Sequence, residues 1–196
     1  MNDLGPSHTP PASEPGAHRN LEQENRTLRA FTSALRDLTD IIERQSGNPD
    51  VMGLLDSVLQ GALEITDTRD GSLLAVDEDT NELVFAAVRG EVEAPLGWRR
   101  IPPGKGIVGW VVENRCSTIV NDPHEDERFY DTLDVMFRFR TSSLLAVPLI
   151  GDGKLLGVIE VLNRQDGQLF STGDQTLLTL FGRLAGELLH NILGKA

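Results

Sequence analysis

The chain has 196 residues, a formal net charge of −12 and a single cysteine, with 39% hydrophobic and 24% charged residues. This length and composition are typical of one globular domain with a sizeable core plus appendages, and the lack of a long apolar run or signal-peptide core favours a cytoplasmic protein. The negative charge disfavours nucleic acid or an anionic membrane as a partner, and one cysteine excludes an intramolecular disulfide framework.

Residues 1–20 form the first segment of the chain. They contain four of the ten prolines, together with Gly, Ser and Ala, and almost no large apolar side chains. Such a composition cannot bury enough surface to offset the entropy of ordering. We therefore predict a disordered tail.

A helix is expected next, over residues 21–46. Leu21, Leu28, Leu35 and Ile42 recur every seven residues, which is the spacing of a coiled-coil seam. The same pattern is compatible with a helix packed on its own domain. Because the seam precedes the globular part and keeps a seven-residue repeat, we favour a coiled-coil dimerisation helix.

Residues 48–194 are predicted to form the globular domain. Gly47-Asn48-Pro49 marks a break, with Asn48 as the expected N-cap and Pro49 at the first helical position of an amphipathic helix. The two apolar runs 71–78 and 82–90 flank Asp79-Thr80-Asn81 and predict a β-hairpin, followed by a loop over 91–100.

Shorter elements follow. IPPGKGIVGW predicts a Pro/Gly turn that enters a short helix at about Gly106, and STIVND predicts a strand over 117–122. The acidic stretch 122–134 is expected to be loop and short helix.

A second hairpin and a final helix complete the domain. The runs 142–150 and 154–163 enclose Gly151-Asp152-Gly153, a tight-turn sequence. Ser171, three residues before Asp174, predicts a capping box at the start of an apolar-periodic helix that continues to Leu193. Hairpins in place of βαβ units imply a mostly antiparallel sheet, so the predicted class is α+β.

Catalytic and metal-binding patterns are scarce. The four histidines are scattered without metal-ligand spacing, and no nucleophile elbow or triad motif is present. Cys116 is interpreted as a structural small residue. The sequence therefore predicts a binding module, with no metal site and no catalytic residues, rather than an enzyme.

One block of residues resembles a known family. Asn163, Arg164, Phe170, Asp174 and Gln175 are similar to the NKFDE signature of the regulatory GAF domains of cyclic-nucleotide phosphodiesterases, with Arg for Lys and Gln for Glu. The resemblance implies a signal-transduction module with a central antiparallel sheet. It also implies terminal helices on one face and a ligand pocket on the other, here preceded by the coiled-coil helix.

The same resemblance implies a set of ligand contacts and a ligand, with cGMP or cAMP as the expected molecule. Phe137 stands where the family has a small hydroxyl residue. The positions that match ligand-contacting residues are Ile107, Val108, Tyr130, Asp134, Phe137, Thr141 and Glu160. Two alternatives stay open: a sensor of another small metabolite, and a ligand-free dimerisation scaffold whose pocket is filled by Phe137, Tyr130 and Trp110.

The NKFDE-like residues themselves are expected to be structural. Arg164 and Asp174 should form an ion pair between strand end and last helix, and Phe170 should anchor the intervening loop, while Asn163 ends the strand. A homodimer is expected through the Leu21–Ile42 helix and the C-terminal helix. No kinase, cyclase, phosphodiesterase or DNA-binding segment is evident, so the output is expected to lie in an unidentified partner or in a longer protein.

Overall fold

The structure is a computed structural model that describes residues 15–44, 50–91 and 99–194. Within these ranges, six strands form one antiparallel sheet in the order β3-β2-β1-β6-β5-β4. The strands are β1 (Thr68–Val76), β2 (Leu83–Arg89), β3 (Arg100–Ile101), β4 (Thr118–Val120), β5 (Leu144–Gly151) and β6 (Lys154–Arg164). The helices are α1 (Pro15–Arg44), α2 (Val51–Thr66), α4 (Gly106–Asn114), α5 (Thr132–Phe137) and α6 (Thr172–Leu193), with a short 3₁₀ turn η1 (Pro123–Glu125).

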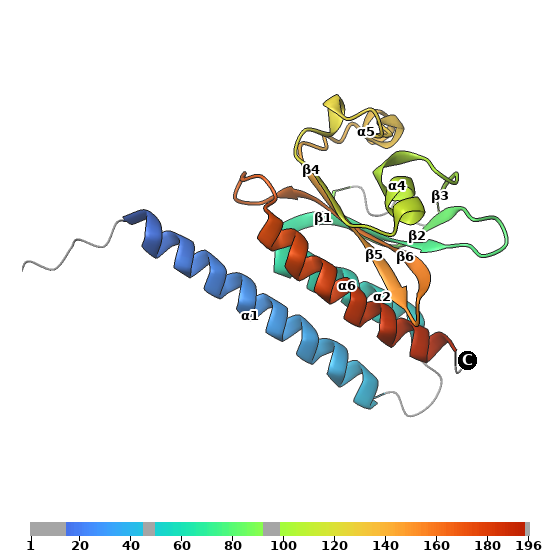
Figure 1. The fold of residues 1–196 in the computed structure, drawn as a ribbon, viewed down its shortest axis with the longest axis horizontal. Coiled ribbons are helices and arrows are strands. Elements are labelled where there is room, and N and C mark those ends of the chain that lie inside the picture. The colour runs from blue at the N-terminus through green and yellow to red at the C-terminus, as the bar shows by residue number, and fades with distance from the viewer. Residues whose placement is uncertain (1–14, 45–49, 92–98, 195–196) are drawn as a thin grey trace, which may run out of the picture.

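The elements are arranged in layers. Helices α2 and α6 pack on one face of the sheet, with α1 outside them, and α4 and α5 lie on the other face (Figure 1). The expected α+β class with an antiparallel sheet is confirmed. In the part of the chain that the structure describes, no helix is both long enough and apolar enough to span a lipid bilayer.

The predicted β5–β6 hairpin forms. Gly151 pairs with Lys154, and the two residues between them, Asp152 and Gly153, both have left-handed backbone angles (φ 48° and 70°). A two-residue turn with positive φ at both positions follows the right-handed twist of the strands it joins. The turn sequence therefore fixes the register of the two strands.

The predicted β1–β2 hairpin also forms, although β1 begins at Thr68 rather than at residue 71. Its turn is organised by Asp77, whose Oδ1 accepts hydrogen bonds from the N–H groups of Asp79 and Thr80 at 3.1 and 3.2 Å. Arg100 Nη1 lies 2.8 Å from Asp77 Oδ2, and this contact lowers the pKa of Asp77. Arg100 belongs to β3, so the loop expected over 91–100 ends in a short edge strand.

The start of α2 differs from the prediction. Its N-cap is Asp50, whose Oδ1 accepts from the N–H of Gly53 at 2.9 Å, rather than Asn48. Asp and Asn are equally favoured at the N-cap, so residue preference alone does not distinguish Asp50 from Asn48. Asn48 itself lies outside the described residues.

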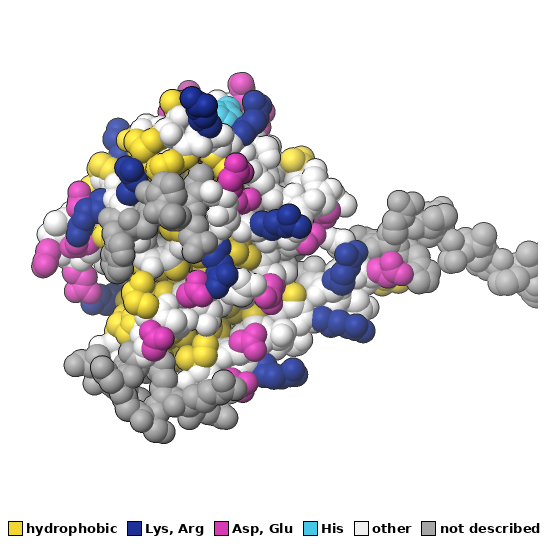
Figure 2. All heavy atoms as spheres, turned by 180° about the vertical axis from the view of Figure 1, so that it is seen from behind, with side chains coloured by type: hydrophobic (Ala, Val, Ile, Leu, Met, Phe, Trp, Pro, Cys, Tyr) yellow, Lys and Arg dark blue, Asp and Glu magenta, His cyan; other side chains and the backbone are white. Residues whose placement is uncertain are grey.

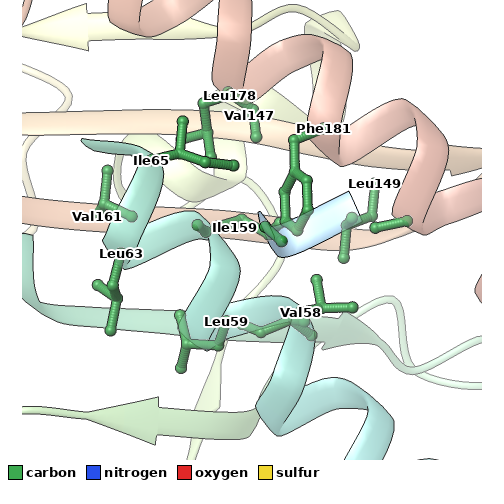
Figure 3. Packing of buried hydrophobic residues seen from close by; sticks show 14 of the residues in the cluster. Val58, Leu59, Leu63, Ile65, Val147, Leu149, Ile159, Val161, Leu178 and Phe181 are labelled. Carbon is green, nitrogen blue, oxygen red and sulfur yellow. The ribbon is translucent and has the colours of Figure 1, made fainter. Parts of the chain in front are cut away.

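Alternation along the strands divides the core in two. On the helix face, Ile159 and Val161 of β6 pack with Val147 of β5 against α2 and α6, with Phe181 at the centre (Figure 3). On the other face lies a second cluster of buried apolar side chains. It contains Val158 of β6, which is adjacent to Ile159 in the sequence, together with residues of α4. Because successive side chains of a strand point to opposite faces, β6 contributes to both clusters.

Helix α1 is longer than expected at its N-terminus. It begins at Pro15, whereas the sequence predicted a tail to residue 20; residues 1–14 lie outside the described ranges. Proline is tolerated in the first helical turn, and once a helix has formed, adding residues to its end requires little free energy. No proline follows until position 49, so nothing in the sequence blocks this extension.

The second half of α1 packs on its own domain, in contrast to the favoured partner-helix interpretation. Ala34 and Leu38 are buried against the core that α2 and α6 share, and Phe31, Leu35 and Ile41 pack beside them. Leu21 and Leu28 remain exposed, at 59% and 53%. A seven-residue repeat fits intrachain and interchain packing alike, so the pattern did not distinguish them.

The corner between β6 and α6 is held by polar contacts. Arg164 Nη1 donates to Asp174 Oδ1 at 2.7 Å, and both side chains are more than nine-tenths buried. Asp174 Oδ2 accepts from the N–H and Oγ of Ser171, while Ser171 Oγ accepts from the N–H of Asp174. The capping box that the sequence predicted is therefore present and is combined with an ion pair.

Asp174→Ala should lower the free energy of unfolding by about 2–3 kcal/mol, because it removes the cap and leaves one side of the buried Arg164 without its partner. Arg164 keeps Asp166, which limits the loss. Asp174→Asn retains an acceptor for Ser171 and should lose less. Urea titration measures both variants.

The matched control is Asp131→Ala, which removes an exposed carboxylate that makes no capping hydrogen bond. It should stay within about 0.5 kcal/mol of wild type. A loss of only a few tenths of a kcal/mol in Asp174→Ala would mean that apolar packing alone holds this corner.

Candidate ligand pocket

A pocket lies on the face of the sheet opposite α2 and α6. It encloses about 750 Å³ of empty space, counting its open mouth. Its floor comes from β1, β2, β5 and β6, and its walls come from α4, α5 and the segments around α5.

All seven positions that the resemblance assigned to a ligand line this one pocket. They come from three separate parts of the chain: the start of α4, the segment from Tyr130 to Thr141, and β6. Convergence of distant segments on one cavity is what a binding site requires. Contact with a ligand stays a prediction for each of them.

Asp134 and Thr141 are joined across the end of α5. The N–H and Oγ1 of Thr141 donate to the two carboxylate oxygens of Asp134, at 2.7 and 2.8 Å. His124 Nε2 lies 3.5 Å from Asp134 Oδ2. Both Asp134 and Thr141 are at least nine-tenths buried, so Asp134 positions Thr141 and keeps limited hydrogen-bonding capacity for a ligand.

Glu160 lies on the pocket floor beside Ser72. The two residues are cross-strand partners on β6 and β1, and Ser72 Oγ donates to Glu160 Oε2 at 3.5 Å. Burial raises the pKa of Glu160 to about 7, the hydrogen bond from Ser72 lowers it, and the negative charge of Asp134 raises it further. Glu160 is thus a carboxyl group that can carry its proton near neutral pH.

Sequence reasoning missed part of the lining. Asp70, Ser72 and Arg89 also border the pocket. Arg89 Nε donates to Asp56 Oδ1 at 3.1 Å, and Asp70 Oδ1 accepts from the N–H of Glu91 at 2.9 Å. The available signal was the strand period, because residues that pair directly across antiparallel strands share a face and Ser72 pairs with Glu160.

The first turn of α4 borders the pocket. Gly106 has φ 75°, a left-handed angle that favours glycine, and Ile107 and Val108 follow it on the pocket wall. Lys105 is the N-cap residue and its side chain makes no capping hydrogen bond. Within the described residues, the initial N–H groups of the helix thus have no capping side chain, and the positive end of the helix dipole lies at the pocket.

The aromatic residues border the pocket without all entering it. Tyr130 and Phe137 are among the lining residues, whereas Trp110 is not and instead lies under the guanidinium of Arg128, 4.8 Å from its ring centroid. Arg99 lies over the Phe137 ring at 5.3 Å. The arrangement thus differs from a pocket filled by all three rings, which the scaffold alternative expected.

Charged side chains cover the surface as a mixture of both signs (Figure 2). Around the pocket the charged side chains are mostly acidic, with Asp70, Asp134 and Glu160 against Arg89.

Across residues 15–44, 50–91 and 99–194, no three His, Cys, Asp or Glu side chains cluster in a way that could hold a metal ion.

An antiparallel sheet with terminal helices on one face and a pocket on the other is the architecture that the resemblance implied. Residues 49–190 match the GAF domain family, and the chain belongs to that family. The resemblance drawn from the NKFDE-like residues is therefore confirmed. GAF domains are regulatory signalling modules.

One sequence relative and two solved structures are similar to the chain. It is 26% identical over 162 residues to the dual 3',5'-cyclic-AMP and -GMP phosphodiesterase 11A of Takifugu rubripes, covering 78% of this chain and 18% of that protein. The GAF domain of a phosphoenolpyruvate-protein phosphotransferase from Coxiella burnetii superposes with a TM-score of 0.73 at 16% identity, covering 87% of this chain and 96% of that one. Free methionine-R-sulfoxide reductase from Neisseria meningitidis superposes with a TM-score of 0.66 at 17% identity over the full length of both. The two structural likenesses show the fold alone.

Glu160→Gln should stabilise the domain at pH 8 relative to wild type and leave it nearly unchanged at pH 5. A folded-state pKa of about 7 against an ordinary value of 4.5 means that the folded protein holds this proton more tightly. The contribution of Glu160 to stability is thus complete below pH 4.5 and is lost as pH rises through about 7. The variant should gain about 2–3 kcal/mol over wild type across this window.

Urea titrations of both proteins at pH 5 and pH 8 measure the effect. Glu127→Gln, which neutralises an exposed carboxylate, serves as the control and should show no such pH dependence. A Glu160→Gln variant that is equally stable relative to wild type at both pH values would contradict the raised pKa.

Proposed function

We propose that this chain is a cyclic-nucleotide-binding regulatory domain, without catalytic activity of its own, that takes cGMP or cAMP into the pocket beneath α4 and α5. The observation that carries the proposal is the gathering of all seven family-matched positions around one cavity. The relative whose printed name includes cyclic AMP and cyclic GMP adds support. Because this chain spans 18% of that relative, the activity of the relative is not transferred to it.

An anionic phosphate in an acidic protein needs local compensation. The start of α4 supplies it in this proposal, because free N–H groups and the positive dipole end favour an anion there. Ile107 and Val108 belong to this first turn, and Lys105 precedes it. The phosphate would therefore bind at α4 rather than beside the carboxyl groups of Asp134 and Glu160.

The remaining lining residues suit a nucleoside. Thr141 Oγ1 donates to Asp134 and retains acceptor capacity for a ligand hydroxyl or amine. Glu160 offers a carboxyl group on the floor, and Tyr130 and Phe137 offer aromatic surface for a base. Phosphate, sugar and base would thus each meet a suitable group.

Addition of cGMP or cAMP at 100 times its Kd should stabilise the folded domain by about 2.7 kcal/mol, since the nucleotide binds only the folded state. For a chain of this size, this corresponds to a rise in Tm of roughly 5–10 °C. Thr141→Ala should reduce the rise, because it removes a ligand contact and the group that Asp134 positions. Thermal melts with and without nucleotide measure the shift for each variant.

Thr176→Ala is the matched control, because this hydroxyl is exposed on α6 on the other face of the sheet. Its nucleotide-induced shift should equal that of wild type. Absence of any shift or calorimetric heat at millimolar nucleotide would remove the cyclic-nucleotide function and leave another metabolite or a scaffold role.

We further propose that the domain forms a homodimer through α1 and α6. Leu21 and Leu28 on α1, and Leu180 and Leu184 on α6, are large apolar side chains with 43–59% of their surface exposed. The two helices are in contact along one side of the molecule (Figure 1). A two-fold arrangement would bring these leucines against their copies.

The dimer would allow a structural change at the pocket to be transmitted to a partner protein. Asn163 is the penultimate residue of β6, the strand that carries Glu160, and its side-chain amide binds the segment from Arg140 to Ser143 that follows α5. Arg164 then connects this strand to α6. A shift of the α5 segment on ligand binding would therefore act on the helix that faces the second copy. The output protein that responds is unidentified.

Leu21→Glu/Leu28→Glu should convert a dimer into a folded monomer, because it places four charges in the apolar interface. Light scattering should give twice the chain mass of 21.5 kDa for wild type and the chain mass for the variant. Val135→Glu is the control: Val135 is 72% exposed on α5, on the opposite face of the sheet, and should leave the dimer intact. A monomeric wild type would reject the proposed assembly.

A further inference from the structure

Glu160 occupies the middle of β6, where the sheet forms the floor of the pocket. Its direct neighbours in the sheet are Ser72 on β1 and Ala146 on β5, neither of which carries a charge. Among the described residues its side chain receives one hydrogen bond, from Ser72, and takes part in no ion pair. Oε1 receives none of these bonds, and Oε2 can accept a second hydrogen bond beside that from Ser72, so both carboxyl oxygens can meet a ligand in the pocket.

The charged groups around Glu160 are mostly acidic. From α5, Asp134 contributes a negative charge, with His124 of η1 beside it. From β1 comes Asp70, and from β2 comes Arg89, the one lining cation in the described residues, which is held by Asp56. With no cation paired to it, Glu160 has accessible charged and neutral forms near pH 7.

These two forms present different hydrogen-bonding faces. A carboxylate offers acceptors only, whereas a carboxylic acid offers one donor and one acceptor. Guanine has two adjacent donors on its Watson–Crick edge, N1–H and the N2 amino group, and also the O6 acceptor. Adenine has the N6 amino donor beside the N1 acceptor. A carboxylate therefore pairs with guanine and opposes adenine N1, whereas the neutral acid can pair with either base.

We propose that Glu160 is the residue that discriminates between the two purines, and that its proton decides which cyclic nucleotide the pocket accepts. This inference rests on the proposed cyclic-nucleotide function. The ionised side chain accepts from guanine and excludes adenine; the protonated side chain donates to adenine N1 and accepts from the N6 amino group. Pairing with adenine thereby couples binding of cAMP to uptake of a proton, whereas pairing with guanine requires no proton.

Calorimetric titration of the whole chain with cAMP and with cGMP at pH 5.5 and pH 8.5 tests the proposal. Neither nucleotide changes its own charge in this range. In wild type, the ratio Kd(cAMP)/Kd(cGMP) should rise at least tenfold from the lower to the higher pH, which is the scale of discrimination that one bidentate hydrogen-bonded pair with a base provides (~1–3 kcal/mol). In Glu160→Gln, the ratio should stay constant, because an amide keeps its donor and its acceptor at every pH.

The Ser72→Ala variant provides a second test. It should change the pH at which cAMP affinity falls, which a purely structural role of Glu160 would leave unchanged. The Ser72 hydroxyl lowers the pKa of Glu160 by donating to its charged form, so its removal should shift the midpoint of the cAMP affinity profile to higher pH. The midpoint is measured independently of the absolute affinity, so a general weakening of binding would not imitate the shift.

The outcomes separate this inference from the function on which it rests. If neither nucleotide binds at either pH, the proposed function fails and the inference fails with it. If both bind with a ratio that does not change with pH, the inference is overturned while the function stands. If wild type and Glu160→Gln show the same pH dependence, or if Ser72→Ala leaves the midpoint in place, another group is responsible and Glu160 is not the discriminating residue.

Discussion

The central position of β6 is the constraint on which the other features of the domain depend. Its two neighbours, β1 and β5, both pair with it along most of their length. Ile159 and Val161 face the helices, while Val158 and Glu160 face the pocket side of the sheet. A shift of one residue in this register would place a carboxyl group in the apolar core and Ile159 in the pocket. The same pairing therefore specifies the core and the site.

The end of β6 extends this constraint to the rest of the chain. Asn163 adopts a left-handed backbone angle (φ 49°), and its Oδ1 accepts from the N–H groups of Ser142 and Ser143 while its Nδ2 donates to the carbonyl of Arg140. Arg164, the next residue, forms an ion pair with Asp174 at the start of α6. Two consecutive residues thus fix the segment after α5 and the last helix. Asn163 and Arg164 therefore position segments beside the pocket without lining it.

Local signals in the sequence predicted the elements that depend on local chemistry. The Asp152-Gly153 turn and the Ser171–Asp174 capping box were predicted because a few adjacent residues specify them. The packing of α1 was not, because Leu35 belongs to a repeat that suits a partner helix and the helix's own domain equally. Asp70 and Ser72 escaped notice because their place in the pocket depends on the pairing of β1 with β6, which brings residues 72 and 160 together across 88 positions.

The acidic character of the pocket also affects how an anionic ligand can bind. Placing a phosphate in a cavity that already contains Asp134 and Glu160 raises the electrostatic free energy of the site unless a charge is removed. Glu160 can lose its charge by taking up a proton, since burial already raises its pKa to about 7. By linkage, a ligand that raises this pKa on binding also binds more strongly as the pH falls, and the two effects are equal in free energy. For a ligand that pairs with the neutral acid, a proton supplied to the pocket floor therefore takes the place of a compensating cation.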